Sequence, residues 1–272
     1  MFSPANLAPL AWPRNVLVMH DAAVLREPEA YSRAYRAWHA TAGLAAARRA
    51  LGVITVSEFS RRELIDLAGL EPSRVTVIPG GVDPRFAPSA DPEAVAAGLG
   101  LTRPYVLTVA TDDRRKNLEK LAPVATALGG QGIELVWAGD RRPYFADAAA
   151  AAGVRSVGYV DDALLPGLYA GARAFVLASR YEGFGLTCLE AMASGTPVVA
   201  ADRAALPETC GGAALLVDPD DAAAMARAVR IAATDAATRE ALRRAGLQRA
   251  AQFSWDRTAA RVDALLSELA GG

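Results

Sequence analysis

Residues 180–200 read RYEGFGLTCLEAMASGTPVVA, and this stretch says more about the chain than any other. Glu182 and Glu190 stand eight positions apart, and a Gly-Phe-Gly turn directly follows the first carboxylate. An apolar run before the turn predicts a strand, and a helix is expected from about Leu186 to Gly195. Glycine lets a ligand approach the backbone closely, and the free N–H groups at a helix start suit a phosphate. The pattern therefore predicts a site that holds a sugar by its hydroxyls and a phosphate by backbone N–H groups.

The same residues also allow simpler interpretations. Glu190 could be an ordinary surface residue of the helix, and the two glycines could only turn the chain. The two carboxylates could instead serve as a general acid and a general base. These alternatives stay open on this stretch alone.

The composition is that of a globular protein without a strong net charge. The chain has 272 residues, of which 52% are hydrophobic and 22% charged, and its 29 basic and 30 acidic residues nearly cancel. This balance gives no global attraction to nucleic acid, so none is expected as a partner, although a local basic patch could exist. Cys188 and Cys210 are too few for a disulfide framework, which favours a reducing compartment, and they lack metal-ligand spacing.

The start of the chain and its hydropathy predict a cytoplasmic location. The first residues lack both a basic segment and a long apolar core, so we do not interpret them as a signal peptide. No apolar run approaches the ~20 residues that cross a bilayer. We therefore expect a soluble cytoplasmic protein, while peripheral contact with the inner face of the cell membrane stays open.

Short apolar runs alternate with longer helix-like stretches, a pattern that predicts an α/β protein with parallel sheets covered by helices on both faces. A proline-rich stretch after residue 83 separates two parts of this pattern. Strands are expected at 15–19, 52–56, 74–79, 105–110, 133–138, 154–157, 174–177, 197–200 and 214–217. Helices are expected over 31–51 and, near the chain end, over 220–233, 235–250 and 254–270.

Polar residues follow several of these strands, where ligands bind in open α/β sheets. His20 comes after the first strand, and Lys116 follows the strand that opens the second part. Lys116 precedes an expected helix with Asn117 as its N-cap, and a cation at this point suits a diphosphate. Two alternatives stay open: His20 could be a hydrogen-bonded core or surface residue, and Arg114 to Lys116 could form a solvated run.

Other kinds of site find little support in the sequence. Asp218 and Asp220 resemble a metal-binding pair, but their place just before a helix favours N-capping. No Gly-x-Gly-x-x-Gly motif follows the first strand, which argues against a nicotinamide cofactor, and no serine nucleophile elbow occurs. We therefore expect no metal and no cofactor.

The whole stretch 180–200 resembles the C-terminal signature of glycosyltransferase family 4, whose members are retaining enzymes with the GT-B fold, two Rossmann-like domains around a cleft. The family pattern has Glu, Gly, Phe and Gly, then a second Glu, then Ala-Met-Ala-x-Gly-x-Pro-Val-Val, and the chain matches every position. The chain departs mildly at Gly80, where the family usually has Asn. Further matches lie at His20-Asp21, 54–60, 77–83, Arg115-Lys116-Asn117, 206–219 and Phe253-Ser254-Trp255.

The resemblance implies three catalytic residues. Glu182 would hold hydroxyls of the donor sugar, and His20 would lie across the cleft near the same sugar. Lys116 would neutralise the diphosphate leaving group. The anomeric configuration would be retained by front-face attack, with the leaving phosphate accepting the proton of the acceptor.

The resemblance also implies the donor-binding residues. Glu190 would hold the nucleotide ribose, main chain near Val160 would meet the base, and Arg115 would assist at the diphosphate. Backbone N–H groups would bind sugar hydroxyls and phosphate, and these belong to Gly183, Phe184, Gly185, Leu186 and Thr187.

Domain boundaries follow from the same resemblance. Residues 1–84 would form part of an N-terminal, acceptor-side domain, residues 85–103 a linker, and residues 104–252 the donor-binding domain. Residues 253–272 would form a helix that crosses back to the first domain. The opening strands and the glycine-rich loop of a complete first domain are not found in the sequence, so we expect this domain to be incomplete.

The resulting prediction is a retaining glycosyltransferase that moves a hexose from a nucleoside-diphosphate sugar to a saccharide or lipid-linked acceptor. The His-Asp strand end and the Arg-Lys-Asn loop look most like those of mannosyltransferases, so GDP-mannose is the first donor candidate, in polysaccharide or glycolipid assembly. Two alternatives stay open. An incomplete first domain favours a non-catalytic or partner-dependent sugar-nucleotide-binding module, and a sugar-nucleotide epimerase of the GT-B type is the third interpretation.

Overall fold

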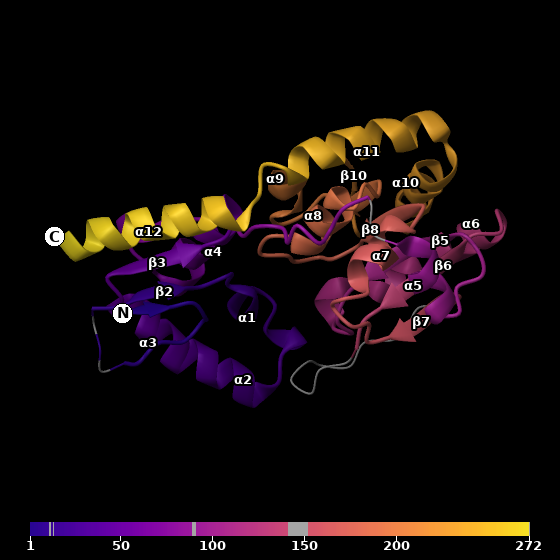
Figure 1. Cartoon of the computed structure of the whole chain (residues 1–272). Coiled ribbons are helices and arrows are strands. Elements are labelled where there is room, and N and C mark those ends of the chain that lie inside the picture. Colours follow the sequence, from indigo (N-terminus) through magenta and orange to yellow (C-terminus); the bar gives the residue numbers. More distant parts are fainter. Residues whose placement is uncertain (11, 13, 89–90, 141–151, 272) are drawn as a thin grey trace.

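The computed structural model describes residues 1–10, 12, 14–88, 91–140 and 152–271. They form two α/β domains, each built around its own sheet (Figure 1). All strand pairs in both sheets are parallel, and helices lie between most of the successive strands. The predicted fold class is therefore confirmed.

The first domain contains a sheet of four strands in the order β1-β2-β3-β4. The strands are β1 (Phe2–Ser3), β2 (Val16–Val18), β3 (Gly52–Thr55) and β4 (Val75–Val77). The helices are α1 (Ala23–Arg26), α2 (Arg33–Trp38), α3 (Leu44–Arg49) and α4 (Glu58–Ala68), with 3₁₀ turns at Pro28–Ala30 and Pro72–Arg74. The sequence predicted three of the strands but not β1, because two residues are too few to show a period.

The single helix expected over 31–51 is interrupted. A π-helical turn at His39–Gly43 separates α2 from α3. Thr41 lies in this turn, and its hydroxyl donates hydrogen bonds to the carbonyl oxygens of Ala37, at 2.7 Å, and of Trp38, at 3.3 Å. A hydroxyl that bonds to the preceding turn competes with the regular backbone ladder, which explains a break that the apolar pattern does not reveal.

The second domain contains a sheet of six strands in the order β10-β9-β8-β5-β6-β7. The strands are β5 (Tyr105–Val109), β6 (Glu134–Ala138), β7 (Val154–Gly158), β8 (Ala174–Leu177), β9 (Val198–Ala201) and β10 (Ala214–Val217). The helices are α5 (Pro92–Gly98), α6 (Ala122–Gly129), α7 (Leu165–Ala170), α8 (Leu186–Ala193), α9 (Leu206–Cys210), α10 (Ala222–Thr234) and α11 (Ala236–Ala250), with 3₁₀ turns at Arg114–Lys116 and Leu118–Leu121. Each strand of this sheet had been predicted within one or two residues.

The segment 85–103, expected as a linker, contains helix α5. This helix packs against α7, and the close approach depends on Gly167. A Cβ atom at Gly167 would lie 2.7 Å from the Val95 side chain, nearer than two carbon atoms can pack. The segment therefore contributes a helix to the second domain. The sequence did not predict this helix because the prolines of the segment favoured a linker.

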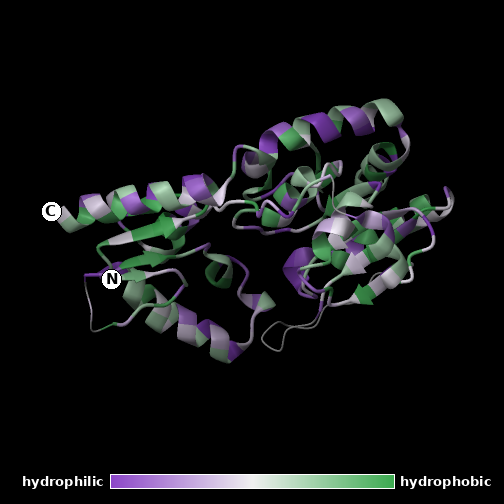
Figure 2. Cartoon of the chain, in the orientation of Figure 1, coloured by the Kyte–Doolittle hydropathy of each residue, from purple (hydrophilic) through white to green (hydrophobic). Residues whose placement is uncertain are grey.

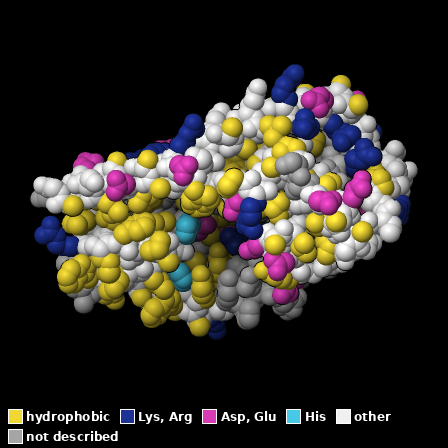
Figure 3. Space-filling model, viewed as in Figure 1, with side chains coloured by type: hydrophobic (Ala, Val, Ile, Leu, Met, Phe, Trp, Pro, Cys, Tyr) yellow, Lys and Arg dark blue, Asp and Glu magenta, His cyan; other side chains and the backbone are white. Residues whose placement is uncertain are grey.

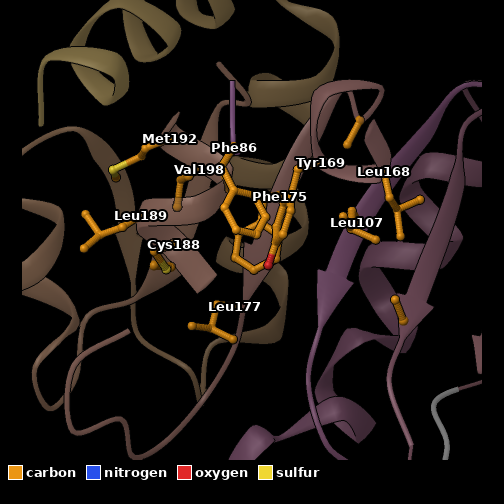
Figure 4. Packing of buried hydrophobic residues seen from close by; sticks show 14 of the residues in the cluster. Phe86, Leu107, Leu168, Tyr169, Phe175, Leu177, Cys188, Leu189, Met192 and Val198 are labelled. Carbon is orange, nitrogen blue, oxygen red and sulfur yellow. The ribbon is translucent and has the colours of Figure 1, made fainter. Parts of the chain in front are cut away.

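Alternating side chains of the second sheet form two separate cores, as the period of a strand requires. Leu107, Phe175 and Val198 face one side, whereas Val106 and Val176 face the other. On the first side the rings of Phe86, Tyr169 and Phe175 pack together, with centroids 5.4–5.7 Å apart (Figure 4). A sheet buried on both faces explains why its strands read as continuous apolar runs.

The C-terminal helix α12 (Trp255–Gly271) lies along the first domain (Figure 1). Its half-buried apolar side chains pack on one face of the first sheet, where they contact Val16, Val18, Ile54 and Ile78. Thr258 Oγ1 donates a hydrogen bond of 2.7 Å to the carbonyl oxygen of Pro79. Figure 2 shows the green strands beneath α12 and the mixed green and purple of the helix itself, as expected for an amphipathic helix.

Within the described part of the chain, no helix combines the length and the apolar character that crossing a membrane requires.

Candidate active site

The order of the second sheet reverses between β5 and β8, and the predicted site lies at the carboxyl ends of these two strands. β5 pairs with β6 on one side and with β8 on the other. The loop after β5 leads to Lys116, and the loop after β8 leads to Glu182. In open α/β sheets a ligand crevice forms at such a reversal. The topology therefore brings together two residues that are 66 positions apart.

Lys116 and Glu182 form a short ion pair. Lys116 Nζ donates a hydrogen bond of 2.6 Å to Glu182 Oε1, and the two side chains are only 16% and 13% exposed. Burial would raise the pKa of Glu182, but the charge and hydrogen bond of Lys116, helped by the charge of Arg115, outweigh it and lower this pKa below its ordinary value. Glu182 is therefore an ionised acceptor at neutral pH, which argues against a role as a general acid.

Asn117, expected as a helix N-cap, holds the loop in another way. It has a left-handed backbone (φ 57°), and its side chain caps no helix. Its amide nitrogen instead donates hydrogen bonds to the carbonyl oxygens of Ala178, at 3.2 Å, and Pro219, at 3.1 Å. The cap of the short 3₁₀ turn that carries Lys116 is Asp113. Asn117 thus stands at the predicted N-cap position, before the 3₁₀ turn Leu118–Leu121, but its side chain binds two distant carbonyl groups instead of the turn.

The turn after Glu182 is held by its carbonyl oxygens. Those of Glu182 and Phe184 accept hydrogen bonds from the Ala205 N–H and the Thr209 hydroxyl. Gly185 then adopts φ 94° and leads into α8. Among the residues that the structure describes, none accepts a hydrogen bond from the N–H groups of residues 184–187. These groups at the start of α8 are thus available to an anionic or hydroxyl-bearing ligand.

Glu190 is held by a buried tyrosine. The Tyr169 hydroxyl donates a hydrogen bond of 3.0 Å to Glu190 Oε2. Burial of Glu190, reinforced by the charge of Asp162, raises its pKa to about 7, although the Tyr169 hydrogen bond acts in the opposite direction. The interpretation of Glu190 as an ordinary surface residue is therefore wrong, because the carboxyl is half-buried and hydrogen-bonded.

Two cavities adjoin the ion pair. The larger, of about 850 Å³, lies between the domains and is lined by His20, Glu182 and residues 183–186 on its polar side. In Figure 3 both histidines of the chain (cyan) lie among hydrophobic side chains (yellow), beside the hollow between the domains. The smaller cavity, of about 280 Å³, is lined by Lys116, Val160 and Thr187 among others. Most of the predicted residues thus line two adjoining cavities that meet at the Lys116–Glu182 pair.

Arg115 and Glu190 line neither of these cavities. Arg115 Nε lies 3.2 Å from Asp113 Oδ1, and its guanidinium stands over the ring of Tyr31 in the first domain, 5.1 Å from the centroid. Its side chain is 10% exposed. The structure therefore places Arg115 in the contact between the domains, whereas Lys116 presents its charge to the cavity.

The acidic pair before α10 takes part in surface ion pairs. Asp218 and Asp220 both lie near Arg203, at 3.3 and 3.6 Å. The N-cap of α10 is the neighbouring Asp221, whose side chain accepts a hydrogen bond from the Ala224 N–H. An aspartate of this segment does cap α10, as predicted, but it is Asp221 and not Asp218 or Asp220.

Sequence reasoning did not identify two residues near the site. Tyr169 is a buried residue of α7, and nothing in the local sequence pattern shows that its hydroxyl reaches Glu190. Tyr159 borders the smaller cavity beside Val160 with 64% of its surface exposed. An aromatic residue at the end of β7 was a signal that could have been recognised, because exposed tyrosines next to strand ends offer a surface for stacking.

Comparison with known proteins agrees with this geometry. The family model described as Glycosyltransferase Family 4 matches residues 2–86, and that described as Glycosyl transferases group 1 matches residues 103–235. O-antigen chain mannosyltransferase B of Escherichia coli is 35% identical over 232 residues, which cover 75% of this chain and 57% of that protein. The chain thus spans little more than half the length of this relative.

Solved structures share the same architecture. Sucrose-phosphate synthase from Thermosynechococcus elongatus is 29% identical with a TM-score of 0.77, over 95% of this chain and 68% of that one. HepE from Anabaena, solved with UDP-glucose, is 21% identical with a TM-score of 0.78, over 94% of this chain and 72% of that one, and shows the common fold alone.

The protein is of the GT-B class. It has two parallel-sheet domains, and its site lies between them where the strand order of the second sheet reverses. The chain belongs to glycosyltransferase family 4.

Proposed function

We propose that the chain acts as a retaining glycosyltransferase that moves a hexose from a nucleoside-diphosphate sugar to a saccharide or lipid-linked acceptor. The observation that carries this proposal is the Lys116–Glu182 ion pair at the start of α8, between two cavities. The relatives and both family models are transferases, so a non-catalytic binding module is not favoured.

The two cavities suggest how the donor lies. The sugar would occupy the larger cavity, where Glu182 accepts hydroxyl hydrogen bonds and His20 faces it from the first domain. The Phe184 N–H would meet the sugar, and the diphosphate would lie at the N–H groups of residues 185–187, beside Lys116. The nucleoside would then extend into the smaller cavity, toward Val160 and Tyr159. Its ribose would lie on the side of that cavity nearer to Glu190, which does not line the cavity itself.

The chemistry follows from where charge develops. As the bond from sugar to diphosphate breaks, negative charge grows on the leaving phosphate, and Lys116 together with the positive end of α8 stabilises it. The leaving phosphate accepts the proton of the attacking hydroxyl on the same face, so the configuration is retained. This scheme requires neither a metal nor a second ionisable carboxyl, and an ionised Glu182 serves it as a hydrogen-bond acceptor.

Mannose, carried by GDP, remains our first donor candidate. It is supported by the 35% identity to a protein named as a mannosyltransferase. A lipid-linked acceptor is supported by the apolar residues that line much of the larger cavity, among them Val18, Ile54 and Leu266. With such an acceptor, the protein would work at the inner face of the cell membrane.

The test is transfer of labelled sugar from a panel of GDP- and UDP-sugars, with Lys116→Ala and Glu182→Ala as the informative variants. We expect each to lose at least a hundredfold in rate, because removing one preorganised electrostatic group costs about two to three powers of ten. Arg114→Ala is the matched control: it removes an exposed cation of the same loop and should leave the rate within a factor of two. If Lys116→Ala and Glu182→Ala retain full activity, the site assignment is wrong.

A further inference from the structure

One peptide of the donor site is held by the first domain. The hydroxyls of Ser57 and Ser60 both donate hydrogen bonds to the carbonyl oxygen of Gly183, at 2.6 and 2.9 Å. Both serines are fully buried, with exposures of 1% and 0%. Ser57 also caps α4 by accepting a hydrogen bond from the Ser60 N–H. Two buried donors thus converge on a single carbonyl of the opposite domain.

Gly183 is also in close contact with Asp21. A Cβ atom at Gly183 would lie 2.6 Å from the Asp21 Cβ, so the backbone approaches the first domain as closely as only glycine allows. Asp21 is itself fixed, because its Oδ1 accepts a hydrogen bond of 2.9 Å from the Ala23 N–H. The first domain therefore confines this peptide both by hydrogen bonds and by contact.

The second domain makes a reciprocal contact. Glu208, on α9, accepts hydrogen bonds from the N–H groups of Glu58 and Phe59, at 2.8 and 3.1 Å, at the first turn of α4. A carboxylate stabilises the positive end of a helix. Arg249 in turn donates to the carbonyl oxygen of Glu208 at 2.7 Å, which anchors α9. Hydrogen bonds in both directions therefore join the start of α4 in the first domain to Gly183 and α9 in the second.

Holding the carbonyl of a peptide also fixes the direction of the N–H group in the same peptide. In a trans peptide the N–H of one residue points opposite to the carbonyl of the residue before it. Because the Gly183 carbonyl faces the two serines, the Phe184 N–H points away from them. Gly183 and Phe184 both line the larger cavity. Rotating this peptide would change the direction of an N–H group at the wall of this cavity.

We propose that Ser57, Ser60 and Glu208 are positioning residues that orient the Gly183–Phe184 peptide toward the sugar of the donor. The first domain thereby contributes to donor recognition through residues that do not touch the donor. This inference rests on the proposed function, in which the sugar occupies the larger cavity and the diphosphate lies beyond it.

The informative variant is Ser60→Ala, because it removes one hydrogen bond to Gly183 and leaves the Ser57 cap of α4 in place. Calorimetry compares GDP-mannose with GDP, and UDP-glucose with UDP. We expect Ser60→Ala to bind the nucleotide sugar about five- to tenfold more weakly, the worth of one hydrogen bond. The free diphosphate should bind within twofold of the unmodified protein. Glu208→Ala, at an exposed position, is the second variant and should act in the same direction.

A second readout needs no ligand. Amide hydrogen exchange in residues 183–187 should be faster in Ser60→Ala than in the unmodified chain. Ser32→Ala is the control, because Ser32 also caps a helix of the first domain, α2, where it accepts a hydrogen bond from the Tyr35 N–H at an exposed position. The inference is overturned if exchange in residues 183–187 is as slow in Ser60→Ala as in the Ser32→Ala control. It is also overturned if Ser60→Ala loses the same affinity for the nucleotide sugar as for the free diphosphate. If the unmodified protein binds no nucleotide sugar, the proposed function fails, and the exchange rates alone decide whether the serines hold the peptide.

Discussion

Glu190 lies on α8 with its carboxyl half-buried and hydrogen-bonded to Tyr169, and these surroundings set its charge. Burial raises its pKa from 4.5 to about 7. Between these two values the folded protein binds more protons than the unfolded chain, so the free energy of unfolding falls as pH rises through this window. The carboxylate that suits a ribose is therefore ionised at a cost in stability.

Replacing Glu190 with Gln tests this link. The variant keeps a hydrogen-bond acceptor for Tyr169 but cannot ionise, so its free energy of unfolding should change less between pH 5 and pH 8. At pH 8 the variant should be more stable than the unmodified protein by about 2–3 kcal/mol, while it binds the nucleotide more weakly. Urea unfolding across this pH range measures the effect.

Glu240→Gln serves as the control, because the side chain of Glu240 is 66% exposed on α11. Its pH dependence should match that of the unmodified protein. An unchanged pH slope in Glu190→Gln would contradict the raised pKa.

At the scale of an element, the start of α8 depends on a glycine in a conformation that other residues avoid. Gly185 has φ 94°, and a Cβ atom there would lie 2.6 Å from the Leu206 side chain on α9. A side chain at this position would therefore strain the backbone and push α8 and α9 apart. The N–H groups of the first turn of α8 would move with it.

We expect Gly185→Ala to lower the free energy of unfolding by about 1–3 kcal/mol, the cost of a left-handed backbone in a non-glycine residue together with the clash. Donor affinity should fall as well. Gly98→Ala in α5 is the matched control, since a Cβ atom there meets nothing within 4 Å and φ is not positive. It should stabilise the protein by about 0.5–1 kcal/mol. Equal effects of the two changes, measured by urea unfolding, would refute the strain argument.

At the scale of the whole molecule, contacts of several kinds join the domains. The Ala22 N–H donates to the Tyr181 hydroxyl at 3.2 Å, and Arg115 stands over Tyr31. Helix α12 follows α11 of the second domain but packs on the sheet of the first (Figure 1). The stability of the first domain should therefore depend on the last helix of the chain.

Leu265→Ala should destabilise the first domain by about 1–3 kcal/mol, because this half-buried side chain packs on the first sheet. Limited proteolysis should then cleave the first domain earlier, while the second domain resists as before. Ser267→Ala, at an exposed position of the same helix, should change the stability by less than about 0.5 kcal/mol. Simultaneous cleavage of both domains in Leu265→Ala would show that α12 does not support the first domain selectively.

Much of the fold could be read from the sequence because its signals are local. A buried strand shows as a short apolar run, as at Ala174–Leu177, and an amphipathic helix shows a regular spacing, as at Trp255–Gly271. The two elements that the sequence did not predict in the first domain also have local causes. β1 is too short to show a period, and the π turn after Trp38 arises from one hydroxyl that bonds to the turn before it.

The sequence by itself determined the parallel α/β architecture, the glycine turn after Glu182 and the membership of the family, since these depend on neighbours in the chain. The tertiary structure alone decided the state of the site. It paired Lys116 with Glu182, drew Arg115 into the contact between the domains, and placed Glu190 against Tyr169. Charge and pKa depend on burial and on partners that are distant in the sequence, so no local pattern could reveal them.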